Sequence, residues 1–472
     1  MTICGNYRHT KIIATLGPAT DSPEKLRALI RSGVDVVRLN MAHGTPEWTA
    51  NIIQRIRDAS WDVARSVAVM MDVKGPEIRT GRVEAPVELV EGQTFEFYTE
   101  TPTPGVDGVD VNYHGLPEDV VVGNTVLVDS GLIRLRVEEK DATHVRCRVL
   151  IGGTLGSKRH INLPGVQVRL PPLTKKDEMD LATGVKHGID FVALSFVREA
   201  QDVQILRKFL DSLGSQARII SKIEDQTGVR NLDEIVSASD AIMVARGDLG
   251  IEIDYHMLPV VQNRIVEACH KEGKPVIIAT HLLESMVSSP MPTRAEISDV
   301  SNGVREMADA IMLSGETTTG RFPLECVDVL KNIVRSNEPT VKRKINSTIE
   351  LKSPKAKMLR SACGLAQELG DSAIVVYTRS GFLGYVLGAL RPMGVPIFAF
   401  TDVEVVFRQL LLPWGVEPFL MEFHDDPEVT IKRSFDYLKR QKWQISGKWL
   451  VVITNALADE KVIDTLQLRK PD

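Results

Sequence analysis

The chain is poor in cysteine and has no long apolar run. Its five cysteines, at positions 4, 147, 269, 326 and 363, are odd in number and lack CxxC spacing. This distribution argues against a disulfide framework or a cysteine zinc site and predicts reduced thiols in a cytoplasmic protein. No apolar stretch reaches the roughly 18 residues of a membrane span, and residues 1–8 contain no signal-peptide core.

Neither sign of charge dominates the composition. The net charge is −5 and the pI about 6.1, so we expect neither nucleic acid nor a membrane as a partner. With 43% hydrophobic and 25% charged residues, the composition is that of a soluble globular protein. A chain of 472 residues has room for roughly three domains.

Short runs rich in valine and isoleucine recur through the first two thirds of the chain. Such runs are typical of strands that are buried on both faces. Most are followed by a helical pattern, as at residues 22–32, where Ser22 or Asp21 can cap the start and Gly33 the end. Eight strand–helix units are the number that closes a parallel (β/α)8 TIM barrel. The expected strands are residues 11–16, 34–39, 67–71, 191–195, 218–223, 241–244, 276–279 and 310–313.

The third unit is interrupted by a segment of different character. After residues 72–76 (DVKGP) the helical period is absent until residue 175, and alternating, turn-rich stretches take its place. This pattern predicts a small antiparallel β-barrel domain inserted at residues 76–170. Its expected strands are residues 87–89, 94–98, 125–128, 133–137 and 144–150.

A second strand–helix alternation runs from residue 356 to residue 453. It predicts an open, doubly wound α/β sheet with helices on both faces. We therefore expect an α/β protein of three domains. They are the barrel at residues 1–75 and 171–345, the inserted β domain at 76–170, and the C-terminal α/β domain at 346–472.

Charged and polar residues follow almost every expected barrel strand. Active sites of such barrels are built at the C-terminal strand ends, so both signs of charge should converge on one mouth. The residues are Arg38 and Asn40, Asp72 and Lys74, Ser195 and Arg198, Lys222 and Glu224, Arg246 and Asp248, Thr280, and Ser314 and Glu316.

Glu224 and Asp248 follow adjacent strands and can point at a common centre. Two carboxylates that leave the other positions to water and substrate are the usual setting for Mg²⁺ or Mn²⁺. The alternative is that each acid pairs with a neighbouring cation, Glu224 with Lys222 or Asp248 with Arg246. The position of Lys222 beside a predicted metal-binding carboxylate favours a role, together with Arg38, in stabilising the charge of a phosphoryl group. A role of Lys222 as a nucleophile is the open alternative.

Short motifs recur at the expected strand ends and in the inserted segment. They are residues 11–20 (KIIATLGPAT), 37–40 (VRLN), 43–44 (HG), 74–81 (KGPEIRTG), 162–165 (NLPG), 221–224 (SKIE), 243–250 (MVARGDLG), 279–280 (AT), 283–286 (LESM), 292–296 (PTRAE) and 312–317 (MLSGET). Together with the order of the three domains, they resemble the pyruvate kinase family nearly from end to end.

The resemblance implies transfer of the phosphoryl group of phosphoenolpyruvate to ADP, which yields pyruvate and ATP in glycolysis. Lys222 and Arg38 would contact the phosphoryl group, and Thr280 would help to protonate the enol carbon. Glu224 and Asp248 would bind Mg²⁺ or Mn²⁺.

The resemblance also implies further binding residues and a homotetramer. The inserted domain would act as a lid that excludes water during transfer, and the C-terminal domain would serve regulation or oligomerisation. The residues that would frame the substrate carboxylate are Arg246, Gly247 and Asp248, with Thr280 beside them. Those on the nucleotide side would be Asn40, His43, Arg79 and Lys158.

Two departures from the family pattern concern a monovalent cation. Hydroxyl residues are usual where this chain has Ala42 and Val73, which leaves Asn40, Asp72 and the carbonyl of Val73 as oxygen ligands. Glu77 resembles the potassium-dependent members, whereas Val73 resembles the independent ones. We expect K⁺ activation to be weak or absent.

Two further departures concern an effector. Residues 378–381 (Thr378, Arg379, Ser380 and Gly381) resemble a loop that binds a sugar phosphate, but Phe382 and Leu383 follow where Arg and Ser or Thr are common. Residues 456–461 stand in place of a glycine-rich loop. We expect regulation by fructose 1,6-bisphosphate to be weak or lost.

Three functions compete at this stage. The first is a working pyruvate kinase, and the second is a catalytically impaired paralogue that acts as a metabolite-binding or assembly protein. The third is another metal-dependent barrel enzyme acting on phosphoenolpyruvate or pyruvate, such as an aldolase-like lyase. The presence of Lys222, Glu224 and Asp248 favours the first, and the lid disfavours the third.

Overall fold

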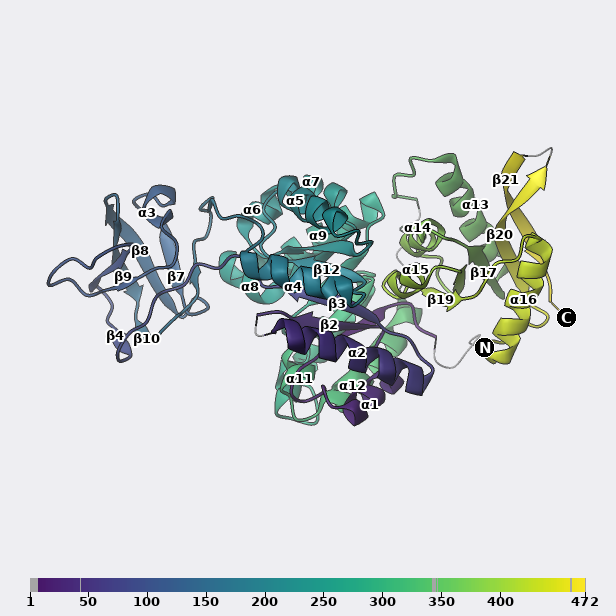
Figure 1. Cartoon of the computed structure of the whole chain (residues 1–472), viewed down its shortest axis with the longest axis horizontal. Helices are drawn as coiled ribbons and strands as arrows, with labels where there is room; N and C mark the ends of the chain where they lie inside the picture. The colour runs from purple at the N-terminus through teal and green to yellow at the C-terminus, as the bar shows by residue number, and fades with distance from the viewer. Residues whose placement is uncertain (1–6, 43, 342–344, 346, 459–460, 472) are drawn as a thin grey trace.

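The computed structural model describes residues 7–42, 44–341, 345, 347–458 and 461–471. Three bodies lie in a row, with a barrel in the middle, a β domain at one end and an α/β domain at the other (Figure 1). Among the described residues, no helix combines the length and the apolar character that crossing a membrane requires.

Eight parallel strands close into the central barrel. Their order is β1-β16-β15-β14-β13-β12-β3-β2, so the predicted TIM barrel is confirmed, and each strand lies within a few residues of its expected bounds. The strands are β1 (Lys11–Thr15), β2 (Val36–Asn40), β3 (Ala68–Val73), β12 (Phe191–Leu194), β13 (Arg218–Ile223), β14 (Ala241–Ala245), β15 (Val276–Ala279) and β16 (Ala310–Leu313).

Helices between the strands form the outer layer of the barrel. The start of α1 decides between the two expected caps: the Ser22 side chain accepts a hydrogen bond from the Lys25 backbone N–H, and Gly33 ends the helix at φ 108°. The main helices are α1 (Pro23–Ser32), α2 (Pro46–Val63), α4 (Lys175–Lys186), α5 (Ala200–Ser212), α6 (Gln226–Arg230), α7 (Leu232–Ala238), α8 (Arg246–Glu252), α9 (Leu258–Glu272), α10 (Arg294–Arg305), α11 (Gly315–Thr318) and α12 (Pro323–Asn337).

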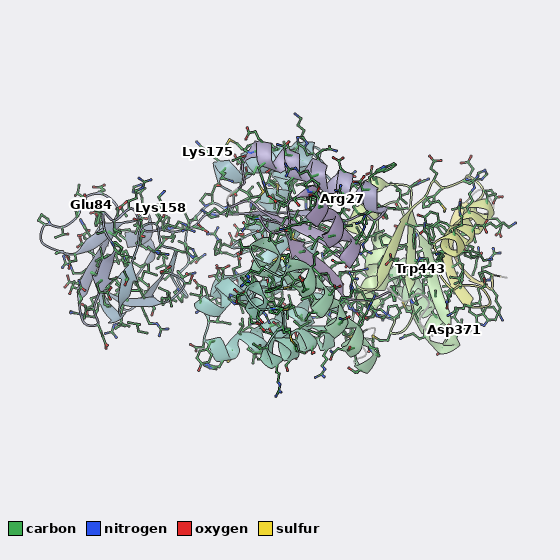
Figure 2. All side chains as sticks on the ribbon, turned by 90° about the horizontal axis from the view of Figure 1, so that it is seen from below. Arg27, Glu84, Lys158, Lys175, Asp371 and Trp443 are labelled. Atoms are coloured by element: carbon green, nitrogen blue, oxygen red, sulfur yellow. The ribbon has the colours of Figure 1, made fainter. Side chains whose placement is uncertain are left out.

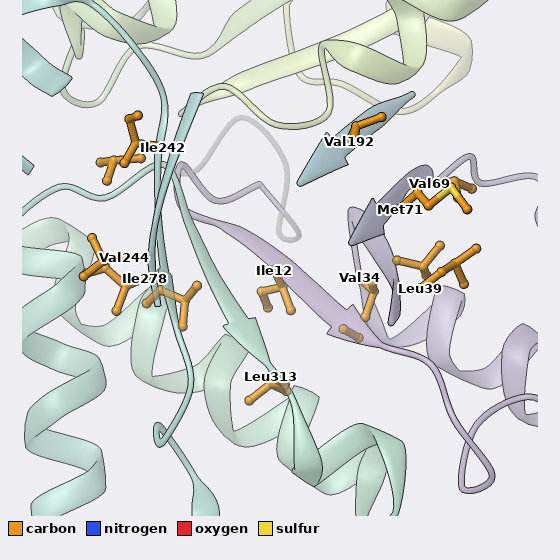
Figure 3. Packing of buried hydrophobic residues seen from close by; sticks show 14 of the residues in the cluster. Ile12, Val34, Leu39, Val69, Met71, Val192, Ile242, Val244, Ile278 and Leu313 are labelled. Atoms are coloured by element: carbon orange, nitrogen blue, oxygen red, sulfur yellow. The ribbon is translucent and has the colours of Figure 1, made fainter. Parts of the chain in front are cut away.

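The barrel strands are buried on both faces, as their composition predicts. Ile12, Val69 and Ile278 belong to the cluster between strands and helices (Figure 3). Ile13 and Met70, their alternates along the strands, belong to a second cluster inside the barrel. Because apolar side chains fill both faces, polar groups are confined to the strand ends.

The inserted domain lies between β3 and α4. Its strands form one sheet of order β11-β7-β8-β9-β5-β6 and a separate pair of β10 with β4. All these ladders are antiparallel except the one between β5 and β6. Phe95, Phe97 and Leu135 belong to a core of its own, so the insert is a folded body and not an extended loop. Its elements are β4 (Val87–Leu89), β5 (Thr94–Tyr98), β6 (Gly108–Asp110), α3 (Leu116–Asp119), β7 (Thr125–Val128), β8 (Ile133–Lys140), β9 (His144–Ile151), β10 (Gly153–Leu155) and β11 (Ile161–Asn162).

The C-terminal domain is a five-stranded sheet of order β19-β18-β17-β20-β21, with β21 antiparallel to its neighbour. Helices cover both faces, because Ile374 of β17 packs with α13 and α14 whereas Val375 packs with α16. The doubly wound architecture is therefore confirmed. The elements are α13 (Pro354–Leu369), β17 (Ser372–Tyr377), α14 (Phe382–Leu390), β18 (Ile397–Thr401), α15 (Glu404–Gln409), β19 (Val416–Leu420), α16 (Pro427–Arg440), β20 (Trp449–Ala458) and β21 (Lys461–Arg469).

The C-terminal domain packs against the N-terminal ends of the barrel strands. Leu411 and Leu412 join the apolar cluster inside the barrel. Asp309, just before β16, accepts hydrogen bonds from Arg391 Nη1 at 2.9 Å and from the Trp414 backbone N–H at 2.9 Å. The C-terminal domain therefore covers the N-terminal ends of the barrel strands, and an active site can form only at their C-terminal ends.

Candidate active site

Lys222, in β13, occupies the centre of the barrel mouth. Its ammonium group is 2.8 Å from Glu224 Oε1 and 3.4 Å from Asp72 Oδ1, and it donates a hydrogen bond to Ser195 Oγ at 2.9 Å. Burial alone lowers the pKa of Lys222, but the two carboxylates outweigh burial and the net shift is upward. A lysine held in its charged form is not a nucleophile, so the structure disfavours the Schiff-base alternative.

Asp72, at the end of β3, joins Lys222 to Arg38 of β2. Arg38 Nε donates to Asp72 Oδ2 at 2.6 Å, and Arg38 Nη1 donates to Thr15 Oγ1 at 3.1 Å. Burial raises the pKa of Asp72, but Arg38 and Lys222 reverse that effect and hold the pKa below its usual range. The two predicted phosphoryl-binding cations are thus brought together by one buried carboxylate.

Glu224 and Asp248 are the two carboxylates that the sequence predicts as metal ligands. Burial raises the pKa of Glu224; Lys222 counteracts the rise and Asp248 adds to it, so the net shift is upward. Glu224 Oε2 accepts the Phe196 backbone N–H at 2.6 Å. Within the described part of the chain the Asp248 carboxylate accepts no hydrogen bond, and no three His, Cys, Asp or Glu side chains gather as a metal cluster.

These two acids fit a hard divalent cation bound largely by water and substrate oxygens. A cation between them would relieve the repulsion that raises the pKa of Glu224. The alternative pairing of each acid with a neighbouring cation holds only in part. Lys222 does pair with Glu224, but Arg246 pairs with Asp299 at 2.8 Å and not with Asp248.

Thr280 follows β15 in a strained conformation. Its φ of 68° is unusual for a β-branched residue, and His281 has φ 52°. The hydroxyl of Thr280 accepts the Gly247 backbone N–H at 2.7 Å and donates to the Ala279 carbonyl at 2.7 Å. Arg246 Nη2 donates to the carbonyls of Thr280 at 2.7 Å and His281 at 2.9 Å. The guanidinium of Arg246 therefore holds this turn in place.

Comparison with known proteins identifies the family of the chain. Residues 7–327 match the family model described as pyruvate kinase, barrel domain, and residues 356–467 match pyruvate kinase, alpha/beta domain. The chain is 38% identical to plastidial pyruvate kinase 3, chloroplastic, of Arabidopsis thaliana over 98% of this chain and 82% of that protein. It is 41% identical to a pyruvate kinase of Geobacillus stearothermophilus over 87% of this chain and 71% of that protein.

A solved structure of similar fold gives the same result. A pyruvate kinase from Cryptosporidium parvum superposes with a TM-score of 0.93 at 35% identity, covering 98% of this chain and 96% of that one. The chain belongs to the pyruvate kinase family. It is accordingly a phosphotransferase that moves a phosphoryl group from phosphoenolpyruvate to ADP, and this catalytic function is favoured over an impaired paralogue.

In this pyruvate kinase the oxygens predicted for a monovalent cation are already engaged. Asn40 Oδ1 accepts the Ala42 backbone N–H at 3.1 Å, and the Val73 carbonyl accepts the Ser195 hydroxyl at 2.8 Å. Asp72 is bound by Arg38 and Lys222. Glu77 is likewise paired, with Lys74 at 2.9 Å and Arg79 at 2.6 Å.

The residues predicted for the nucleotide divide between two domains. Asn40 lies at the end of β2 on the barrel, and Lys158 lies on the inserted domain (Figure 2). Arg79 connects to the latter, because its Nη1 donates to the Lys158 carbonyl at 2.8 Å. His43 lies outside the described residues.

The predicted effector loop precedes α14. Gly381 has φ 81°, and its backbone N–H donates to Thr378 Oγ1 at 3.0 Å. Arg379 donates to Asp402 at 2.8 Å, and Phe382 is 41% exposed at the first position of the helix. A pocket of about 380 Å³ beside the loop is lined by aromatic and hydroxyl side chains, such as Phe382, Phe423 and Thr430, and by the basic residues Lys355, Arg379 and His424.

Residues 456–458 and 461, which stand in place of a glycine-rich loop, belong to strands. Backbone pairing of β20 with β21 runs as far as Ala458 and Lys461, so the strands extend through most of residues 456–461. Residues 459 and 460 lie outside the described residues.

Two participants in the site were not among the predicted catalytic residues. Ser195 accepts from Lys222 and donates to the Val73 carbonyl, and the Phe196 backbone N–H binds Glu224. The position of Ser195 at a strand end is visible in the sequence. Its bond to Lys222 depends on the register of β12 against β13, which no sequence motif reports.

We predict that Ser195→Ala lowers kcat by roughly 10- to 100-fold, because a hydrogen bond to a charged group is worth about 1.5–3 kcal/mol. The matched control is Ser221→Ala, which removes a buried hydroxyl bonded to Ser239 at 2.6 Å from the opposite face of β13. Steady-state kinetics of both variants test the assignment. Equal kcat values for the two would show that Ser195 only stabilises the fold.

Proposed function

We propose a division of roles within the phosphotransferase site. Glu224 and Asp248 hold Mg²⁺ or Mn²⁺, which when bound would neutralise negative charge on the transferring phosphoryl group. Lys222 and Arg38 contact the same group from the other side. The observation that supports this proposal is the buried ammonium of Lys222, which two carboxylates keep charged and orient before substrate arrives.

The proton-transfer side of the reaction is proposed to lie at Thr280. Its hydroxyl is fixed between the Gly247 backbone N–H and the Ala279 carbonyl. The N-terminal turn of α8 carries Gly247 and Asp248. Because the Gly247 N–H is bound to Thr280, the Asp248 backbone N–H is the group of this turn that would meet the substrate carboxylate. We assign Arg246 to this subsite as the group that holds the Thr280 turn.

The nucleotide is proposed to bind between the barrel and the inserted domain. Asn40, with His43 near it in sequence, would contact ADP from the barrel, and Arg79 and Lys158 from the insert. Closure of the insert over the mouth would exclude water, whose attack on the phosphoryl donor is the competing reaction.

We predict ADP-dependent pyruvate formation with Mg²⁺ or Mn²⁺, and its loss in Lys222→Met. Removal of one preorganised charge at a transition state costs roughly 10²–10³-fold in kcat, so at least that loss is expected. A coupled pyruvate assay measures it, and Mn²⁺ titration should show metal binding largely unchanged.

The matched control is Lys274→Met. Lys274 is likewise a lysine whose ammonium group is hydrogen-bonded, in its case to the Ser239 backbone carbonyl at 2.6 Å, but it precedes β15 at the opposite end of the barrel. This control should retain activity. A wild-type protein that binds metal and phosphoenolpyruvate without forming pyruvate would instead support the impaired paralogue.

We propose that K⁺ activation is weak or absent. The oxygens of Asn40, Asp72 and Val73 already have partners, and Ala42 and Val73 offer no hydroxyl. Activity in a buffer free of Na⁺ and K⁺ should therefore change little when K⁺ is titrated, with choline as the ionic-strength control. A large, saturable stimulation by K⁺ would contradict this prediction.

We propose that fructose 1,6-bisphosphate regulates the enzyme weakly or not at all. Thr378 and Arg379 have partners within the domain, and the apolar Phe382 stands at the start of α14, where a phosphate would meet the helix N-terminus. Micromolar fructose 1,6-bisphosphate should leave the half-saturating phosphoenolpyruvate concentration unchanged. The comparison variant is Phe382→Arg, and a clear shift already present in the wild type would refute the proposal.

We further propose a cytoplasmic homotetramer. The four described cysteines are free and buried, which supports a reducing compartment. Two surfaces support self-association: Tyr255, Met257 and Val260 are exposed at the start of α9, and β21 presents an exposed apolar edge. Sedimentation velocity at micromolar concentration tests the assembly state, and a monomer would exclude it.

A further inference from the structure

The inserted domain meets the barrel at helix α8, which is the helix that carries Asp248. In Figure 1, α8 lies on the side of the barrel that faces the insert, and β7 on the side of the insert that faces the barrel. A Cβ placed on Gly131, in the turn between β7 and β8, would lie 3.4 Å from the Ile251 side chain. The insert therefore rests directly on the last turn of α8.

A buried hydrogen bond ties the two bodies together at this point. Asn162 of β11 donates from Nδ2 to Glu252 Oε1 at 2.9 Å, and the two residues are 4% and 7% exposed. The second amide atom, Asn162 Oδ1, is buried and has no hydrogen-bond partner among the described residues. Because both side chains are shielded from water, breaking the bond would leave two unsatisfied polar groups, which gives the contact a defined geometry.

Glu252 is connected to both metal-binding carboxylates through short stretches of backbone. It lies four residues after Asp248 in α8, which places the two side chains on one face of the helix. Its carbonyl accepts a hydrogen bond from Gln226 Nε2 at 2.6 Å, and Gln226 begins α6 two residues after Glu224. A shift of Glu252 would therefore be transmitted to Asp248 and to the loop behind Glu224.

The carboxyl of Glu252 has no cation among its electrostatic partners. Burial raises the pKa of Glu252 to about 7, the Asn162 hydrogen bond opposes the rise, and Asp225 and Asp248 add to it. A polar group in this position works by hydrogen bonding and not by ion pairing. An amide of the same length can therefore replace the acid and can also offer an N–H to the unpartnered Asn162 oxygen.

We propose that Asn162 and Glu252 are positioning residues for phosphoryl transfer, because their hydrogen bond seats the inserted domain on α8 and aligns it with Asp248. This inference rests on the roles proposed above for Asp248 and for the insert as a lid. In this proposal Asn162 and Glu252 fix the position of the inserted domain on the barrel without contacting the substrate. Their loss should reduce turnover and water exclusion more than it changes substrate affinity.

Two variants that keep the number of side-chain heavy atoms test the proposal. Asn162→Leu removes the hydrogen bond while filling the space, and Glu252→Gln keeps an acceptor for Asn162 and adds a donor. We expect Asn162→Leu to lower kcat at least about tenfold, which corresponds to 1.4 kcal/mol, with a smaller change in KM for phosphoenolpyruvate. We also expect it to raise the share of pyruvate formed without ADP. Glu252→Gln should remain close to the wild type in both respects.

The control for stability of the insert is Asn124→Ala, which removes a hydrogen bond to the Val121 backbone N–H inside that domain. It should leave kcat and ADP coupling unchanged. An active wild type together with wild-type kcat and coupling in Asn162→Leu would overturn the inference while leaving the proposed function intact. Equal losses in Asn162→Leu and Glu252→Gln would overturn it too, because the acid would then be needed as a charge.

Amide hydrogen exchange supplies a readout that does not depend on activity. In Asn162→Leu the amides of α8 and β11 should exchange faster than in the wild type, whereas those of α5 should not change. Unchanged exchange in α8 would overturn the inference even if the enzyme proved inactive. If the wild type were inactive but the α8 and β11 amides of Asn162→Leu exchanged faster, the contact between the insert and α8 would be supported. Only the proposed function would then be refuted.

Discussion

The active site depends on one buried ammonium ion. Lys222 is 8% exposed, and an ion removed from water at this depth costs several kcal/mol unless partners compensate it. Its partners Asp72, Ser195 and Glu224 come from the ends of three neighbouring strands. The pairing of β3 with β12 and of β12 with β13 must therefore be in register, because a slip of one residue would turn these side chains to the helical face.

Most of the fold can be predicted from the sequence because each barrel strand is apolar on both faces. That composition distinguishes a parallel barrel strand from the half-buried strands of the insert, which alternate in polarity. The strand–helix alternation at residues 356–453 predicts C-terminal strands at residues 373–377, 396–400 and 449–453, and β19 and β21 are not among them. The alternation in β21 is that of an edge strand with one exposed face, and β19 includes Pro418, so neither carries the apolar run that identified the others.

Less of the site can be predicted, and the reason is geometric. The sequence places charged residues at the strand ends, and the barrel then brings Arg38, Asp72, Lys222 and Glu224 together without further information. The sequence does not show which hydrogen-bond donor each acceptor in the site binds. The bonds of Arg246 to the Thr280 turn depend on a left-handed backbone at two consecutive residues, the first of which is a β-branched threonine that disfavours it.

The catalytic cluster and the predicted effector loop differ in how strongly their contacts depend on one another. In the cluster every charge compensates another in a dry environment, so the replacement of one member leaves its neighbours buried and unpaired. The effector loop is held by partly exposed contacts, such as those of Arg379 with Asp402 and with the Phe423 ring, and the Arg379 side chain is 69% exposed. Substitutions there remove weak interactions and leave no buried charge unpaired. Physical coupling therefore makes the centre of this enzyme less tolerant of substitution than its periphery.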